Sequence, residues 1–122
     1  MENEPLNFEG KYTELQRKTL ACKEVEEHED CIPIILQHFT RPSLKYPKQK
    51  KLLLHRSATT AELIHYIRKD CKLVDAREGV FLCLRSHNYI LKGDRQIGSL
   101  YEKYKSKDAW LYVLYSSQDF SG

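Results

Sequence analysis

Apolar positions in the first part of the chain are spaced three and four residues apart, as on one face of a helix. Between residues 13 and 27 they are set among charged side chains, which predicts a moderately amphipathic helix. A shorter helix over residues 8–12 is expected to precede it, weakened by Gly10. The apolar or small positions of the longer helix are Leu15, Leu20, Ala21, Cys22 and Val25.

Two aliphatic runs that follow predict a pair of β-strands. Residues 31–39 ("CIPIILQHF") are mostly aliphatic, and Pro33 lies near the start, where a missing N–H is tolerated. Residues 50–55 ("KKLLLH") come after a loop punctuated by prolines and are close enough in sequence to pair antiparallel with the first strand. Their three consecutive leucines do not alternate with polar residues, as a strand with one solvated face would require. This strand is therefore expected to be apolar on both faces.

The sequence "TTAE" (residues 59–62) predicts the start of a further helix. In such a capping box, Thr59 accepts a hydrogen bond from the amide of residue 62, and Glu62 accepts one from the amide of residue 59. Strands over 79–84 and 110–115 and a short helix over 97–105 are expected after it, with turns over 86–94. The apolar face of the capped helix is formed by Leu63, Ile64, Tyr66, Ile67 and Cys71.

The predicted order of elements is helix, strand, strand, helix, strand, short helix, strand. A hairpin followed by a crossing helix and two further strands is the order of a ubiquitin-like β-grasp. We therefore expect an α+β fold, a β-grasp with two additional N-terminal helices. Residues 1–30 would form a helical extension packed on the core, residues 31–115 the core, and residues 116–122 a flexible C-terminal tail.

Length and composition fit a single domain with a modest core, since the chain has 122 residues of which 41% are hydrophobic and 30% are charged. No apolar run approaches the roughly 20 residues that span a bilayer. The first ten residues lack the basic and apolar regions of a signal peptide. We therefore expect a soluble, monomeric protein of the cytoplasm.

Residues that commonly carry enzymatic or metal chemistry are scattered along the chain. The five glycines form no phosphate-binding loop, no serine lies in a nucleophile elbow, and HExxH is absent. The four cysteines (Cys22, Cys31, Cys71 and Cys83) lack the close spacing of zinc ligands and are expected to be reduced thiols. We therefore expect no enzyme, no catalytic residue, no metal and no cofactor.

The net charge of +3 is unevenly distributed. Residues 1–31 contain nine acids and four bases, whereas residues 32–61 contain six bases and no acid. Such a basic segment attracts acidic peptides, phosphate backbones or anionic membranes, and it is also compatible with a solvated strand edge protected by lysines. A nucleic acid partner is disfavoured, because only Tyr46 is suited to stacking on bases within the basic stretch.

Four motifs carry a resemblance to one family of ubiquitin-like proteins. They are Pro33-Ile34-Ile35 in the first strand, "KKLLLH" from Lys50, "IRK" from Ile67, and "LYVLY" from Leu111, whose last residue, Tyr115, lies seven positions before the terminal glycine. In this order and spacing, the chain from residue 13 onward resembles the autophagosomal ubiquitin-like modifiers, the GABARAP and microtubule-associated-protein light-chain group. We interpret it as a divergent member of that family.

The resemblance implies that an extended peptide is added as a strand to the open edge of the leucine strand. Its motif would be an aromatic residue, two spacers and an aliphatic residue. The resemblance places the aromatic anchor in a pocket formed by Val25, Pro33, Ile35, Lys51, Leu53 and Trp110. It places the aliphatic anchor in a second pocket formed by Leu52, Leu54, Leu63, Tyr66 and Ile67. Acidic residues beside the motif would contact Lys48, Lys50 and Arg68.

The C-terminal glycine is the other functional element that the resemblance implies. In this family the glycine is activated by an E1-like enzyme, transferred to an E2-like cysteine and joined to phosphatidylethanolamine, which places the protein on the autophagosomal membrane. Gly122 would be the conjugated residue here. A cysteine protease of the pathway is a further partner, although Ser121 separates Phe120 from Gly122, whereas the family usually has an aromatic residue directly before the glycine.

Two other interpretations are compatible with the sequence. "QIGSLYE" (residues 96–102) also resembles the autophagy-related twelve-type modifiers, which are joined to a protein lysine instead of a lipid. The third interpretation is an unconjugated ubiquitin-like domain whose peptide groove is its whole function. The first interpretation, a lipid-conjugated adaptor, implies that the chain recruits receptors or cargo with short linear motifs to membranes.

Overall fold

The computed structural model describes residues 7–39, 49–71, 79–117 and 120, with the side chains of residues 70 and 71 left out. Two helices precede the sheet, and the predicted elements occur at the predicted places with boundaries shifted by one or two residues in most cases. In chain order the elements are α1 (Phe8–Lys11), α2 (Glu14–Glu27), β1 (Cys31–His38), β2 (Gln49–His55), α3 (Thr60–Tyr66), η1 (Ile67–Cys71), β3 (Phe81–Leu84), η2 (Arg85–His87), β4 (Tyr89–Ile90), α4 (Ile97–Tyr104) and β5 (Leu111–Ser116).

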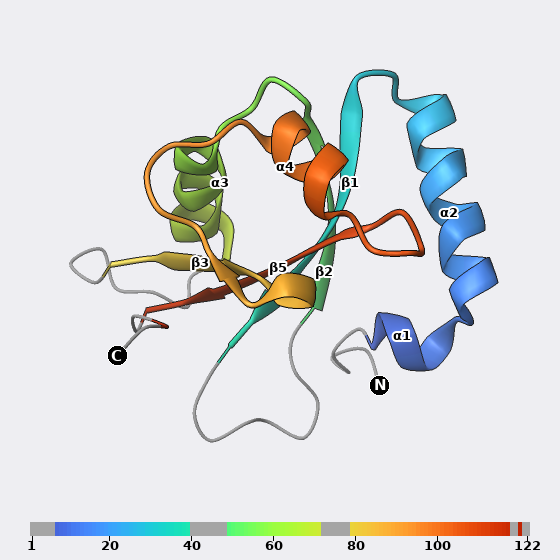
Figure 1. The fold of residues 1–122 in the computed structure, drawn as a ribbon, viewed down its shortest axis with the longest axis horizontal. Coiled ribbons are helices and arrows are strands. Elements are labelled where there is room, and N and C mark those ends of the chain that lie inside the picture. The colour runs from blue at the N-terminus through green and yellow to red at the C-terminus, as the bar shows by residue number, and fades with distance from the viewer. Residues whose placement is uncertain (1–6, 40–48, 72–78, 118–119, 121–122) are drawn as a thin grey trace.

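The strands form one mixed sheet in the order β2-β1-β5-β3-β4. β1 pairs antiparallel with β2 and parallel with β5, so the first and last strands of the core lie side by side at its centre (Figure 1). β3 pairs antiparallel with both β5 and β4. This arrangement confirms the predicted α+β fold with a ubiquitin-like β-grasp and two N-terminal helices.

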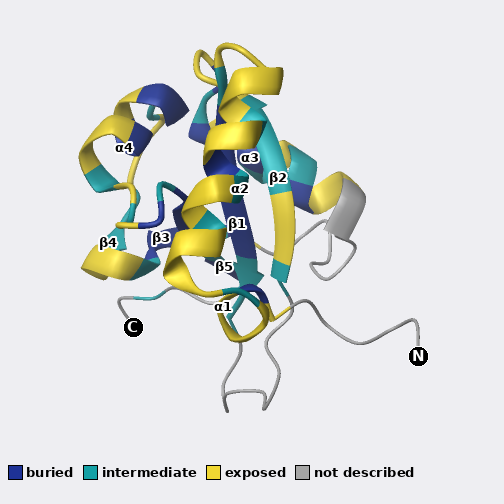
Figure 2. Ribbon diagram, turned by 90° about the vertical axis from the view of Figure 1, so that its right-hand side faces the viewer, coloured by how far each residue is buried: buried dark blue, intermediate teal, exposed yellow. Residues whose placement is uncertain are grey.

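Helices cover both faces of β1, which is why its sequence is almost continuously aliphatic. Ile32, Ile34 and Leu36 belong to the larger core cluster, to which α3 and α4 contribute. Ile35 points to the other face and packs in a smaller cluster with Phe8 of α1 and residues of α2 and β5. Figure 2 shows β1 as a dark blue strand, in contrast to the teal and yellow of the neighbouring β2.

The beginning of α3 is fixed by the predicted capping box. The Thr59 hydroxyl accepts from the Glu62 amide, and the Glu62 carboxylate accepts from the Thr59 amide. The helix does not continue as an α-helix to Cys71, because its last turn widens into the π-helical segment η1. A second capping box, between Thr13 and Gln16, begins α2 and was not predicted.

Turns were expected over residues 86–94, and a short strand within this segment was not predicted. This segment contains the end of the 3₁₀ turn η2 and the two-residue strand β4, which pairs with Cys83 and Leu84 of β3. Asn88 connects them in a left-handed conformation with φ of 48°. A strand of two residues is too short to show alternation in the sequence, and its existence depends on the neighbouring strand.

Replacement of Phe8 by alanine tests how firmly α1 is attached to the sheet. The Phe8 side chain is fully buried and contacts Trp110 edge-on, with ring centroids 4.9 Å apart. We expect Phe8→Ala to lower the free energy of unfolding in urea by about 3–5 kcal/mol, because burial of the ring is lost and a cavity remains. Leu15→Ala in α2 is the control, since Leu15 is 74% exposed and its truncation should change the value by less than about 0.5 kcal/mol. Equal effects of the two substitutions would contradict this packing.

Candidate functional site

β2 forms one edge of the sheet. Every residue from Gln49 to His55 is aligned with a residue of β1, and no other described strand pairs with β2 on its outer side. Part of its backbone N–H and C=O groups therefore face outward, where an extended chain can pair with them. Figure 2 shows this edge beside α2, running along the outer side of β1.

The three leucines of β2 are each half-buried rather than core residues. Leu53 is opposite Pro33 in the strand ladder, and this pair lies on the face of the sheet that α2 covers. Leu52 and Leu54 point to the opposite face and pack against the larger core cluster. The edge therefore presents apolar surface on both sides, as expected from the unbroken leucine run.

A hollow of about 280 Å³ lies between α2 and β2. Of the residues expected in the aromatic pocket, Lys51, Leu53 and Trp110 line this hollow. Leu52, which was assigned to the aliphatic pocket, also contributes to its wall.

The remaining residues of the expected aromatic pocket lie outside the lining. Pro33 and Ile35 are buried on the same face, opposite Leu53 and Lys51 in the strand ladder. From α2 the lining residue is Glu24, whereas Val25, one position later, is 40% exposed. The resemblance placed Val25 in this pocket, but in the structure the residue of α2 that lines the hollow is the preceding one, Glu24.

The residues expected in the aliphatic pocket lie together on the α3 side of β2. Leu52, Leu54 and Tyr66 are half-buried there, whereas Leu63 and Ile67 are fully buried beneath them in the larger core cluster. On this side of the sheet, the side chains that a bound molecule could contact are therefore those of Leu52, Leu54 and Tyr66.

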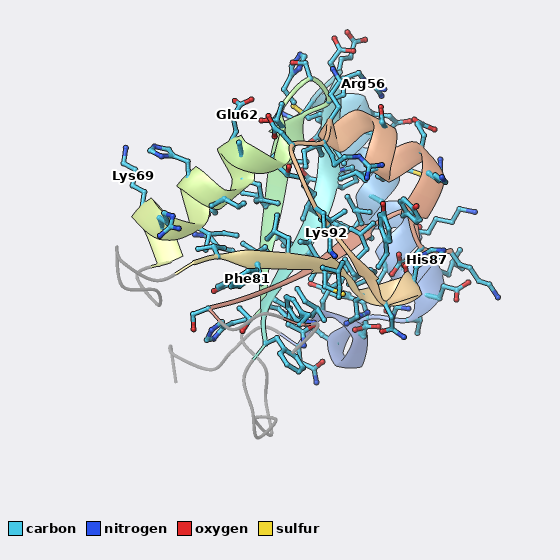
Figure 3. All side chains as sticks on the ribbon, turned by 60° about the vertical axis from the view of Figure 1, so that its left-hand side comes forward. Arg56, Glu62, Lys69, Phe81, His87 and Lys92 are labelled. Carbon is cyan, nitrogen blue, oxygen red and sulfur yellow. The ribbon has the colours of Figure 1, made fainter. Side chains whose placement is uncertain are left out.

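Basic residues surround the α3 side of the edge. The Lys50 ammonium lies over the Tyr66 ring, 5.2 Å from its centroid. Arg68 and Lys69 in η1 are exposed, and Figure 3 shows Lys69 projecting outward at the end of the helix opposite Glu62. Lys48 lies outside the described residues.

A buried carboxylate fixes the wall of the hollow. Asp108 is 3% exposed and accepts hydrogen bonds from Arg17 Nε (2.8 Å), from the amide of Trp110 (3.1 Å) and from the Tyr112 hydroxyl. The indole Nε1 of Trp110 in turn donates to the backbone oxygen of Arg17 (2.7 Å). These bonds connect α2 to the beginning of β5 and hold the Trp110 ring in place.

Burial and the Asp108 carboxylate together shift two pKa values in this network. Burial, the hydrogen bond to Asp108 and the charge of Asp108 raise the pKa of Tyr112 far above its ordinary value, so its hydroxyl stays a donor. Burial opposes the charge of Arg17, but the hydrogen bond to Asp108 and the nearby Tyr112 and Asp108 outweigh it and raise its pKa. Sequence reasoning missed this network, because Arg17 and Asp108 are 91 positions apart and no local pattern links them.

The arrangement of possible metal ligands and of cysteines in the described residues bears on metal and redox chemistry. Within residues 7–39, 49–69 and 79–117, no three His, Cys, Asp or Glu side chains are grouped as metal ligands would be. Cys83 is buried, and burial raises the pKa of its thiol, which lowers its reactivity. None of the described helices has the length and apolarity needed to cross a membrane.

Comparison with known proteins gives the family. Residues 16–122 match the sequence model of the family described as "Autophagy protein Atg8 ubiquitin like". The chain belongs to the Atg8 family. Its members are ubiquitin-like modifiers, which confirms the expectation that this chain is not an enzyme.

Individual Atg8 proteins are similar to this chain over nearly its whole length. It is 25% identical over 116 residues to autophagy-related protein 8h of Arabidopsis thaliana, covering 95% of each chain. It is 28% identical over 107 residues to autophagy-related protein 8 of Dictyostelium discoideum, covering 88% of this chain and 86% of that protein. The crystal structure of Trypanosoma brucei ATG8 is similar with a TM-score of 0.75 and 26% identity, covering 91% of this chain and 93% of that one. The chain is therefore a divergent Atg8 protein, as the motifs predicted.

The raised pKa of Tyr112 predicts a loss of stability at alkaline pH. In the unfolded chain a tyrosine deprotonates near pH 10, whereas folding keeps Tyr112 protonated. Its contribution to the free energy of unfolding is therefore complete below about pH 10 and is lost as the pH rises toward the folded pKa. We expect Tyr112→Phe to show a shallower alkaline fall than the unsubstituted protein when unfolding in urea is measured from pH 8 to pH 11.

Tyr89→Phe provides a control of opposite sign. The hydrogen bond and charge of Arg95 lower the pKa of Tyr89, so this residue adds stability as the pH rises through its folded pKa. Removing its hydroxyl should make the alkaline fall steeper. Identical pH dependence in both variants would show that neither phenol differs between the folded and unfolded states.

Proposed function

We propose that this Atg8 protein recruits autophagy receptors and adaptors by binding their short peptides along the outer edge of β2. The observation that carries this proposal is the combination of an edge without a described strand partner and three half-buried leucines on it. Half-buried leucines leave apolar surface in contact with water, and covering such surface favours association. An added strand covers it and pairs with the outward backbone groups at the same time.

The spacing of the expected motif fits the two sides of this edge. Successive side chains of an extended peptide point to opposite faces, so residues three positions apart also do. An aromatic residue would enter the hollow beside Trp110 on the α2 side. The aliphatic residue, three positions later, would contact Leu52, Leu54 and Tyr66 on the α3 side. Each anchor would contribute about 1.5–3 kcal/mol from burial, before the cost of ordering the peptide is subtracted.

Charge supports a partner with acidic residues beside its motif. Lys50 and Arg68 lie on the α3 side of the edge, and Lys51 lies at the rim of the hollow. Lys48 would extend this basic surface. Rim charges of this kind accelerate association and orient the peptide more than they increase affinity.

The C-terminal segment is proposed to attach the protein to membranes. β5 ends at Ser116, one residue into the segment expected to be the tail, and Phe120 packs against Phe39 with ring centroids 5.4 Å apart. We propose that Gly122, which lies outside the described residues, is activated by an E1-like enzyme and passed as a thioester to an E2-like cysteine. The amine of phosphatidylethanolamine then attacks the thioester carbonyl and the cysteine leaves as a thiolate.

This conjugation would divide the protein between two locations. The unconjugated chain would be cytoplasmic and monomeric, and the conjugate would lie on the autophagosomal membrane. A cysteine protease of the pathway would remove the lipid, with Ser121 in place of the usual aromatic residue at the cleavage site.

Substitution of Leu53 tests the peptide edge. Leu53→Asp places a carboxylate between the strand and the incoming peptide, where it would be desolvated without a partner. We expect binding of an aromatic-x-x-aliphatic peptide to weaken at least about tenfold in calorimetry, in line with a penalty of about 1–3 kcal/mol. Leu15→Asp on exposed α2 surface is the matched control and should bind as the unsubstituted protein does. Unchanged affinity of a folded Leu53→Asp variant would reject this edge as the binding site.

Reconstitution tests the conjugation. With the E1-like and E2-like enzymes of the pathway and liposomes containing phosphatidylethanolamine, we expect a lipid adduct on the full chain and at least a tenfold lower yield after deletion of Gly122. A product on a protein lysine without any lipid adduct would support a twelve-type modifier instead. Unchanged cellular localisation after the same deletion would support an unconjugated interaction domain.

A further inference from the structure

Aromatic rings from three elements meet at the end of the sheet opposite to β2. Among the described strands, β4 is the outermost one there. Tyr89 of β4 and Tyr104 of α4 are stacked, with ring centroids 5.1 Å apart and planes inclined by 23°. The His87 ring of η2 contacts Tyr104 in a T-shaped arrangement, with centroids 5.0 Å apart. We call these three residues (His87, Tyr104 and Tyr89) the aromatic row.

The aromatic row is fixed in place and remains accessible to solvent. Both tyrosines are half-buried and pack against the larger core cluster, whereas His87 is exposed. Rings that are already held by packing lose little conformational freedom when a ligand covers them. The row therefore offers a preformed surface on which a further flat ring can stack.

Two cations border the aromatic row. Arg95 Nη1 donates a hydrogen bond to the Tyr89 hydroxyl (2.9 Å), and the guanidinium carbon lies 5.9 Å from the centroid of that ring. The Lys103 ammonium lies 5.5 Å from the centroid of Tyr104. Neither cation forms an ion pair with a carboxylate of the described residues. Their positive charge is therefore available to an anionic group of a ligand.

A cleft of about 440 Å³ shares His87 with the aromatic row. Two carboxylates of its wall are already neutralised. Glu9 is paired with Arg85 at 2.7 Å, and Asp108 is paired with Arg17 at 2.8 Å. The remaining charged residues of the wall are Glu14, Lys105 and Lys107. Positive charge is therefore in excess, and the volume falls within the range typical of ligand sites.

We infer that the aromatic row and this cleft bind single-stranded nucleic acid. Bases stack on the row, since every base has an aromatic face, and the phosphates are contacted by Arg95, Lys103 and Lys107. The site lies at the other end of the strand order from β2. The inference therefore goes beyond the proposed peptide docking and does not depend on it.

The combination of rings and cations favours a single strand over other polyanions. An acidic peptide pairs with the cations but has no need of a row of aromatic rings. A duplex keeps its bases stacked inside and cannot present their faces to the protein. The basic segment over residues 32–61 lacks suitable rings, whereas positions 87, 89 and 104 are brought together with Arg95 and Lys103 only by the fold.

The experiment measures binding of a fluorescent oligodeoxythymidylate of about 12 nucleotides, a length within the site sizes of single-strand binding folds. Fluorescence anisotropy is followed with the full chain between about 50 and 200 mM salt. An abasic strand of equal length has the same phosphates without bases, and polyglutamate of equal charge has neither bases nor phosphates. We expect the oligodeoxythymidylate to bind at least about tenfold more tightly than either.

Two substitutions of Tyr104 separate stacking from folding. Tyr104→Leu keeps an apolar side chain against the core but removes the ring, and we expect about tenfold weaker binding of the oligodeoxythymidylate. Tyr104→Phe keeps the ring and should bind as the unsubstituted protein does. Far-ultraviolet circular dichroism and urea unfolding establish that both variants are folded. Equal binding by Tyr104→Leu and Tyr104→Phe would overturn the inference.

Removal of charge tests the phosphate contacts. In the double variant Lys103→Gln, Lys107→Gln, we expect the slope of log affinity against log salt to become shallower by about 1.4, because each contact contributes about 0.7 for a single strand. Lys18→Gln on exposed α2 surface is the matched control and should leave the slope unchanged. The same slope in the double variant as in the unsubstituted protein would overturn the contacts.

Three further outcomes would overturn the inference. They are absence of binding at about 50 mM salt, equally tight binding of the abasic strand or of polyglutamate, and displacement of the oligodeoxythymidylate by an aromatic-x-x-aliphatic peptide. The last outcome would place the strand at the β2 edge instead. None of them bears on peptide docking, which the Leu53→Asp measurement tests separately.

Discussion

The position of β1 is the constraint on which the rest of the structure depends. β1 is paired with a strand on each side and covered by helices on each face, so its side chains have no access to solvent over most of its length. Among the described strands, β2 pairs with β1 alone, so β2 forms the outer edge of the sheet. The leucines of β2 then lie between two covering layers of helices and remain half-buried. The enclosed centre and the partly exposed edge are consequences of one topology.

The N-terminal helices are attached to the sheet by hydrogen bonds as well as by apolar packing. Asp108 is a buried charge, and such charges are tolerated only when they are fully hydrogen-bonded. Arg17, Tyr112 and the Trp110 amide satisfy it, and no described buried polar side-chain atom is left without a partner. Because the same network positions Trp110, the attachment of α2 and the shape of the hollow are coupled. Changes in the N-terminal helices are therefore expected to alter the shape of the hollow beside β2.

Membership of the Atg8 family accounts for the architecture of this chain. At 26% identity to Trypanosoma brucei ATG8, the overall fold is retained, with a TM-score of 0.75. Glu24 in the hollow and the acidic end of α2 make the α2 side of this edge negative, whereas Lys50 and Arg68 make the α3 side positive. The two sides of the edge therefore differ in charge although both present apolar surface.

The sequence alone determined the order of the elements, the capping box of α3, the apolar nature of both sides of β2 and the family. These features are visible because they depend on neighbours within a few positions, as periodicity and capping do. The tertiary structure decided that Glu24 rather than Val25 lines the hollow, that Asp108 joins Arg17, and that β4 exists. Each of these depends on how a helix or strand is rotated and placed against a partner distant in sequence. The physical reason is that the orientation of each helix and strand depends on which apolar faces are buried against one another across the whole core. No local pattern of residues encodes that choice.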